Sequence, residues 1–74
     1  MYSYTQFKFR LNHQHGLSRR DIYYIIGVFF EFTDGFTKAY ERPFYDVKQG
    51  KVIYVSWSPK DYAWNILETD CDNQ

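Results

Sequence analysis

The spacing of apolar and polar residues predicts a strand at the start of this chain. In residues 3–13 the apolar side chains Phe7, Phe9 and Leu11 alternate with polar ones. A period of two places every second side chain on the same face of a strand. We therefore expect this segment to bury one face and to leave the other face in solvent.

Two later segments also carry the signals of strands. Residues 36–42 and 51–57 contain many of the aromatic and β-branched residues that favour a pleated sheet. Pro43 interrupts the first segment, and Gln49–Gly50 predicts a tight turn before the second. The sequence does not decide whether residues 44–48 extend this hairpin.

Residues 17–35 carry two conflicting patterns. Their apolar residues recur at i, i+3, i+4, i+7 and i+8, which is one face of a helix, and Ser18 followed by Asp21 is an acidic form of the capping box. A hairpin is the alternative, because the residue types favour strands, Gly27 is costly within a helix, and Asp34–Gly35 is a turn signal. We favour the helix, because several independent signals agree on its position. The apolar residues of its predicted face are Ile22, Ile25, Ile26, Phe29 and Phe30.

A second helix is expected to begin at Ser58. Pro59 would be its first helical residue, and Asp61 would complete the cap. The elements then follow as β-α-β-β-α, and we predict an α+β fold, a two-layer sandwich with two helices on one face of a three-stranded antiparallel sheet. A small all-β barrel is the alternative if residues 17–35 form a hairpin.

Composition predicts one small domain held together by aromatic residues. Among its 74 residues are seven Phe, eight Tyr and two Trp, and the single cysteine, Cys71, excludes an internal disulfide. We expect a single domain over residues 1–70 and a flexible acidic tail over residues 71–74. The absence of an apolar signal segment and of a membrane-length apolar run favours the cytoplasm.

The charges are segregated although the formal net charge is +0. Residues 1–20 contain four cations and no acid, whereas the chain from residue 61 onward contains four acids and no cation. A net charge of zero argues against a general polyanion binder. The cations are Lys8, Arg10, Arg19 and Arg20, and the acids are Asp61, Glu68, Asp70 and Asp72.

Candidate residues for catalysis and metal binding are few. His13 and His15 are two positions apart, but without a second paired cluster a polar turn explains them better than a zinc site. Ser18 and Ser58 are explained as helix caps, and the acids around Cys71 disfavour a reactive thiolate. We predict no catalytic residue, no metal and no cofactor.

The predicted helices leave candidate binding residues on their outer sides. Tyr24 and Val28 are four positions apart and would form one patch, and Trp64 would point away from the apolar stripe of the second helix. Exposed Trp, Tyr and Arg dominate the binding energy of many interfaces. A helix that is apolar on nearly all sides also permits a homodimer. The expected partner-binding residues are Arg20, Tyr24, Val28, Glu31 and Trp64.

These features predict a non-enzymatic protein-binding module that covers a surface of its partner. The small size suits a phage- or plasmid-encoded inhibitor of a host system, for example an anti-CRISPR-like protein acting on a nucleic-acid-processing complex. That step is an analogy of size and composition, because no motif carries it.

Binding of single-stranded RNA or DNA is the alternative function. If residues 3–13 form a strand, tyrosines and cations share the outer face of the sheet, where bases stack on rings and phosphates meet Lys or Arg. The residues of this predicted face are Tyr2, Tyr4, Lys8, Arg10, Tyr40, Arg42 and Tyr54.

Overall fold

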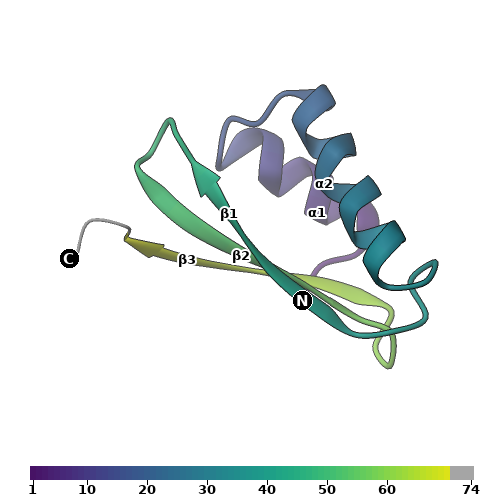
Figure 1. Cartoon of the computed structure of the whole chain (residues 1–74). Helices are drawn as coiled ribbons and strands as arrows, with labels where there is room; N and C mark the ends of the chain where they lie inside the picture. Colours follow the sequence, from purple (N-terminus) through teal and green to yellow (C-terminus); the bar gives the residue numbers. More distant parts are fainter. Residues whose placement is uncertain (71–74) are drawn as a thin grey trace.

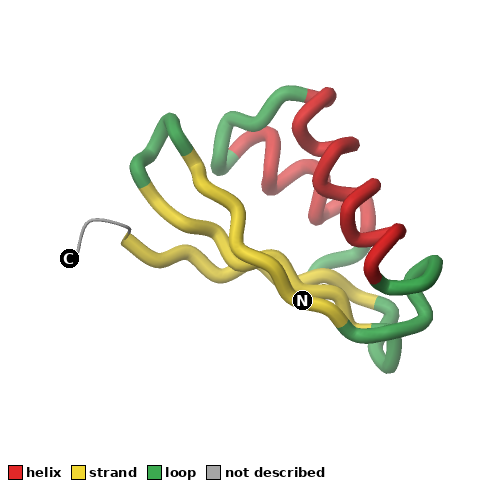
Figure 2. Tube along the Cα trace, viewed as in Figure 1, coloured by secondary structure: helices red, strands yellow, loops and turns green. Residues whose placement is uncertain are grey.

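Two helices are followed by three strands in the computed structural model, which describes residues 1–70 (Figure 1). The strands form one antiparallel sheet in the order β1-β2-β3, and both helices lie over the same face of it (Figure 2). This confirms the predicted α+β class, and the open sheet is not the alternative barrel. The elements are α1 (Tyr4–His13), α2 (Arg19–Phe32), β1 (Tyr40–Asp46), β2 (Lys51–Ser58) and β3 (Ala63–Asp70).

The predicted order of elements is wrong at the start of the chain, where the expected strand is α1. Ser3 caps this helix: its Oγ accepts a hydrogen bond from the Gln6 backbone N–H, and the Gln6 side chain accepts one from the Ser3 backbone. Phe7 and Leu11 are four positions apart, so both reach the core from one side of the helix, while Phe9 is 59 % exposed. The alternation of three apolar residues therefore fits a helix as well as a strand.

The predicted second helix is also wrong, because these residues form the β2–β3 hairpin. The Ser58 hydroxyl does accept a hydrogen bond from the backbone N–H of Asp61, as a cap would. The chain then turns back through Tyr62, whose φ of 53° lies in the left-handed region. Trp64 pairs with Trp57 across the ladder. The hydrogen bond expected of a helix cap is thus made within a turn. The residues that follow form a strand because they pair with β2.

The predicted helix in residues 17–35 is confirmed as α2. The Ser18 side chain accepts a hydrogen bond from the Asp21 backbone at 3.2 Å, and Ile22, Ile25 and Phe29 are buried. Phe30 departs from the prediction, because it is exposed and makes an edge-to-face contact with Phe36 instead of joining the core.

An aromatic cluster at the centre of the core joins both helices to the sheet. The ring of Trp64 stacks on Phe7 with centroids 4.2 Å apart, and it meets Phe29 edge-to-face at 5.3 Å. Tyr2 pairs with the outer edge of β3 through two backbone hydrogen bonds to Trp64. In a chain this small, ring burial replaces the missing disulfide as the main source of stability.

Within residues 1–70, no helix is both long enough and apolar enough to cross a membrane. The expected acidic tail and Cys71 lie outside the described residues.

Candidate functional site

A buried pair joins the loop after α1 to the end of β1. His15 Nδ1 lies 3.0 Å from Asp46 Oδ2, and each side chain is 1 % exposed. An ionised carboxylate only accepts hydrogen bonds, and the tautomer of His15 that matches such a partner is the one with its proton on Nδ1. The second oxygen, Asp46 Oδ1, accepts the backbone N–H of Gln49, while Glu68 Oε2 lies 3.8 Å from His15 Nδ1. Across residues 1–70, His15 Nε2 is the only buried side-chain polar atom without a hydrogen-bond partner.

Two more contacts attach the same loop to the β1–β2 hairpin. Lys48 Nζ donates to the Gly16 carbonyl at 2.8 Å, and the Gln49 side-chain amide donates to the Gln14 carbonyl. Gly16 has a φ of +67°, a left-handed conformation that favours glycine at this bend. The helix pair and the hairpin are therefore held together at this end by polar contacts.

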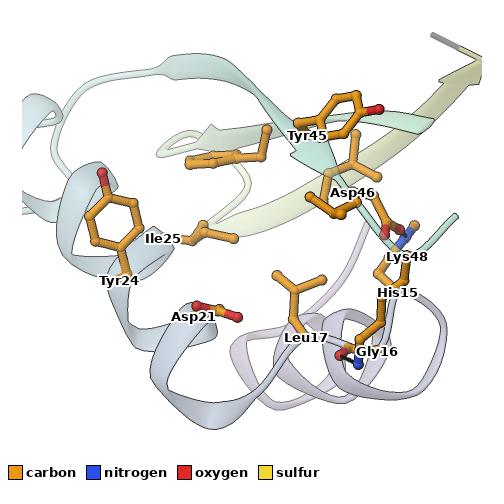
Figure 3. A pocket seen from close by; sticks show the side chains of 12 residues that line it. His15, Gly16, Leu17, Asp21, Tyr24, Ile25, Tyr45, Asp46 and Lys48 are labelled. Carbon is orange, nitrogen blue, oxygen red and sulfur yellow. Dashed lines mark hydrogen bonds and ion pairs between the residues drawn. The ribbon is translucent and has the colours of Figure 1, made fainter. Parts of the chain in front are cut away.

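A cleft of about 350 Å³ lies beside the buried pair, between α2 and β1 (Figure 3). Tyr24 and Ile25 come from α2, whereas Phe44 and Tyr45 come from β1. An Asp–His pair can act as a general base only if the second ring nitrogen reaches a substrate. Here that nitrogen is buried, and no Ser, Thr or Cys lines the cleft. The arrangement favours a structural role for the pair.

A metal site is not formed by the part of the chain that the structure describes. No group of three or more His, Cys, Asp or Glu side chains in residues 1–70 is placed to hold an ion. His13 stacks on Phe9 at the surface, whereas His15 is buried against Asp46, so the two histidines do not act together.

The two helices carry several large rings that are exposed. Six aromatic side chains of α1 and α2 are between 44 % and 63 % exposed. Single exposed apolar residues are common, whereas several large exposed rings on one layer of a small domain make that layer a candidate interaction surface. With the four cations of these helices, the rings define the helix-layer surface: Tyr4, Phe9, Tyr23, Tyr24, Phe30, Phe32, Lys8, Arg10, Arg19 and Arg20.

None of these four cations pairs with a carboxylate of residues 1–70. Lys8 Nζ instead lies 4.3 Å from the ring centroid of Tyr4 and 5.8 Å from that of Tyr23. Arg10 lies over the ring of Tyr2, with its Cζ 5.0 Å from the centroid. A cation held over a ring keeps its charge available to a further partner while losing part of its rotational freedom.

The structure gathers four of the five predicted partner-binding residues on α2. Tyr24 is 63 % exposed, Val28 is half-buried, and Arg20 and Glu31 are exposed, all on the side of the helix away from the isoleucines. The expectation for Trp64 is wrong: it is 2 % exposed and belongs to the core. Its position on a strand, where alternate residues face inward, turns the side chain toward the helices.

The predicted nucleic-acid face does not exist as one surface. Its first residues belong to α1 or to the segment before it, and Tyr40 stacks on Phe32 of α2, on the inner side of the sheet. Tyr54 alternates with the buried residues Ile53 and Val55, so it lies on the opposite sheet face. Arg42 contacts the ring of Phe44 on the inner side. The residues concerned are Tyr2, Tyr4, Lys8, Arg10, Tyr40, Arg42 and Tyr54.

Sequence reasoning missed several exposed rings and the buried pair. Phe9 and Phe30 were predicted to lie on buried faces, and no prediction was made for Phe32, yet all three are exposed. The signal that could have indicated this is a helix with apolar residues on nearly every side, because some of them must then face outward. His15 and Asp46 are 31 positions apart, so no local pattern could connect them.

Comparison with known proteins adds no information on function, because no protein-family model, curated protein or solved structure matches this chain.

Proposed function

We propose that this chain is a protein-binding module whose partner docks on the helix-layer surface. The observation that carries the proposal is the set of six exposed aromatic rings on α1 and α2. Full burial of a ring of this size covers on the order of 150–250 Å², and about half of each of these side chains is still available for a partner to cover. Leaving so many in water is unfavourable, so a partner that covers them would gain that free energy on binding.

One part of this surface is the patch that the sequence predicted on α2. Tyr24 and Val28 lie one turn apart, and the exposed residues Arg20 and Glu31 flank them. An aromatic anchor surrounded by charged residues is the usual arrangement of an interface, where the anchor supplies affinity and the charges supply orientation and association rate. Gly27 beside the patch is exposed, with open space where a side chain would be.

We extend this proposal to the inhibition of a host system as one use of this surface. A domain of 74 residues can act by covering a functional surface of a larger protein, which requires no catalytic residue of its own. An anti-CRISPR-like inhibitor is one form of this proposal, and it rests on size and exposed surface alone.

Affinity capture with paired variants tests the proposed function. The wild-type chain, a Tyr24→Ser/Val28→Ser variant and a Tyr54→Ser/Leu67→Ser control would each be immobilised and exposed to bacterial lysate with and without nuclease. Tyr54 and Leu67 face each other across β2 and β3 on the sheet face that no helix covers, so the control removes a similar apolar area elsewhere.

We expect one protein to be retained by the wild type and the control after nuclease treatment and at high salt. Loss of an aromatic anchor should weaken its binding by at least about tenfold in the Tyr24→Ser/Val28→Ser variant. Retention of nucleic acid that disappears with nuclease would overturn the proposal, as would equal capture by both variants.

A further inference from the structure

We infer that the partner segment that meets the helix-layer surface is acidic, and that it binds in the groove between α1 and α2. This inference rests on the proposed function and adds the chemistry of the partner. The groove has a volume of about 550 Å³, and a stripe of each helix lines it.

The lining of the groove combines an apolar base with two cations. Ile22 is buried beneath the groove, and the exposed rings of Phe9 and Tyr23 lie along it. Lys8 from α1 and Arg19 from α2 bring positive charge from opposite helices. No acidic side chain lines this groove.

The two cations have no anionic partner in the described chain, although carboxylates are available elsewhere in the fold. Lys38 and Lys51 do form ion pairs, with Asp34 at 2.7 Å and Glu68 at 3.8 Å. Lys8 and Arg19 form no ion pair within residues 1–70, so a carboxylate of the partner would be the first anion that they contact. Positive charge of this kind steers an acidic segment toward the groove and makes a basic segment unfavourable there.

An acidic peptide fits this groove better than a nucleic-acid strand. Binding of a single strand relies on ring faces that are open for bases to stack. Lys8 already occupies one face of Tyr4 and lies near the face of Tyr23, and His13 stacks on Phe9 with centroids 4.2 Å apart. Part of the ring surface at the groove is therefore already covered from within the chain, which leaves fewer open ring faces for bases to stack on.

Titration with defined probes tests this inference directly. The probe is a peptide of about a dozen residues with several glutamates around a central leucine, compared with the same peptide carrying glutamine in place of glutamate and with an oligothymidine of similar length. Backbone amide shifts of the full chain would be followed by NMR. The same titration would be run on Lys8→Gln/Arg19→Gln and on the control Lys38→Gln/Lys60→Gln, which removes two exposed cations outside the groove.

We expect the glutamate peptide to shift amides of α1 and α2 around the groove, and the glutamine peptide to shift them far less. The Lys8→Gln/Arg19→Gln change should weaken binding by about tenfold or more, because the glutamates then lose both cationic contacts, whereas the control should bind as the wild type does. The inference is overturned if the glutamate peptide causes no localised shifts, if both double variants bind alike, or if the oligothymidine binds more tightly.

Failure of this inference is distinguishable from failure of the proposed function. A captured protein that is lost with Tyr24→Ser/Val28→Ser but kept with Lys8→Gln/Arg19→Gln would support the proposed function and overturn this inference, because the partner would then bind α2 without using the two cations of the groove.

Discussion

His15 and Asp46 lie 31 positions apart in the sequence, and yet their side chains meet through a 3.0 Å contact inside the protein. One residue follows the helix that opens the chain, and the other ends the first strand. The pair therefore fixes how the β1–β2 hairpin sits against the helices, which is also what shapes the cleft beside Tyr24.

Removing the carboxylate of this pair should strongly destabilise the protein. Asp46→Ala leaves the buried Nδ1–H of His15 without its acceptor, and it also removes the acceptor of the Gln49 backbone N–H. We expect a loss of about 3 kcal/mol in the free energy of unfolding, measured by urea denaturation. Asp46→Asn keeps the same shape and one acceptor oxygen for the Gln49 backbone N–H, and its NH2 group can donate to Nδ1 of the other His15 tautomer, so it should lose clearly less. Equal stability of Asp46→Ala and the wild type would contradict the role assigned to the pair.

Trp64 should behave as a core residue and not as a binding residue. Trp64→Ala removes the ring that stacks on Phe7 and contacts Phe29, so it should cost about 3–5 kcal/mol and lower the thermal midpoint sharply. Phe9→Ala is the matched control, because Phe9 is an exposed ring of α1, and it should change stability by less than about 1 kcal/mol. A Trp64→Ala protein as stable as the Phe9→Ala protein would restore the interface interpretation.

The cap at Ser3 distinguishes the observed helix from the predicted strand. Ser3→Ala removes the acceptor of the Gln6 backbone N–H and should cost about 1 kcal/mol of unfolding free energy. Thr5→Ala, within the first turn but outside the capping box, is the control and should be close to neutral. Secondary chemical shifts of Cα atoms in residues 4–13 give an independent check, since helical and extended segments shift in opposite directions. Extended shifts there would refute α1.

A substitution at Gly27 should change the stability of the domain and its partner binding in opposite directions. It lies within α2 with nothing within 4 Å of the position that a Cβ would take, so Gly27→Ala should raise the unfolding free energy by about 0.5–1 kcal/mol. If the partner approaches the helix backbone closely at this point, the added methyl group should weaken partner binding while the free domain becomes more stable. Calorimetric unfolding together with the capture assay measures both effects. A decrease in stability would contradict this prediction, because it would show that α2 does not tolerate a side chain at this position.

The sequence by itself determined the elements whose signals are local and redundant. The helix over Arg19–Phe32 combines an N-cap, an acidic third residue and an apolar face of helical period, and all of these depend on residues within two or three turns. The turn at Gln49–Gly50 and the strand that follows it depend equally on short-range preferences. The exposed positions around Tyr24 could be predicted for the same reason, whereas the α+β class was right although the first strand and the second helix were exchanged.

Only the tertiary structure decided which secondary structure the two ends of the domain adopt. Phe7 and Leu11 share a face in a strand and in a helix, so their spacing cannot choose between them, and the Ser58 cap signal serves a turn as well as a helix. The choice follows from what each conformation buries: as a strand, Ala63–Asp70 pairs along β2 and turns Trp64 into the core, where Phe7 from α1 stacks on it. Burial of these two rings depends on residues 57 positions apart, and no pattern within either segment contains that information.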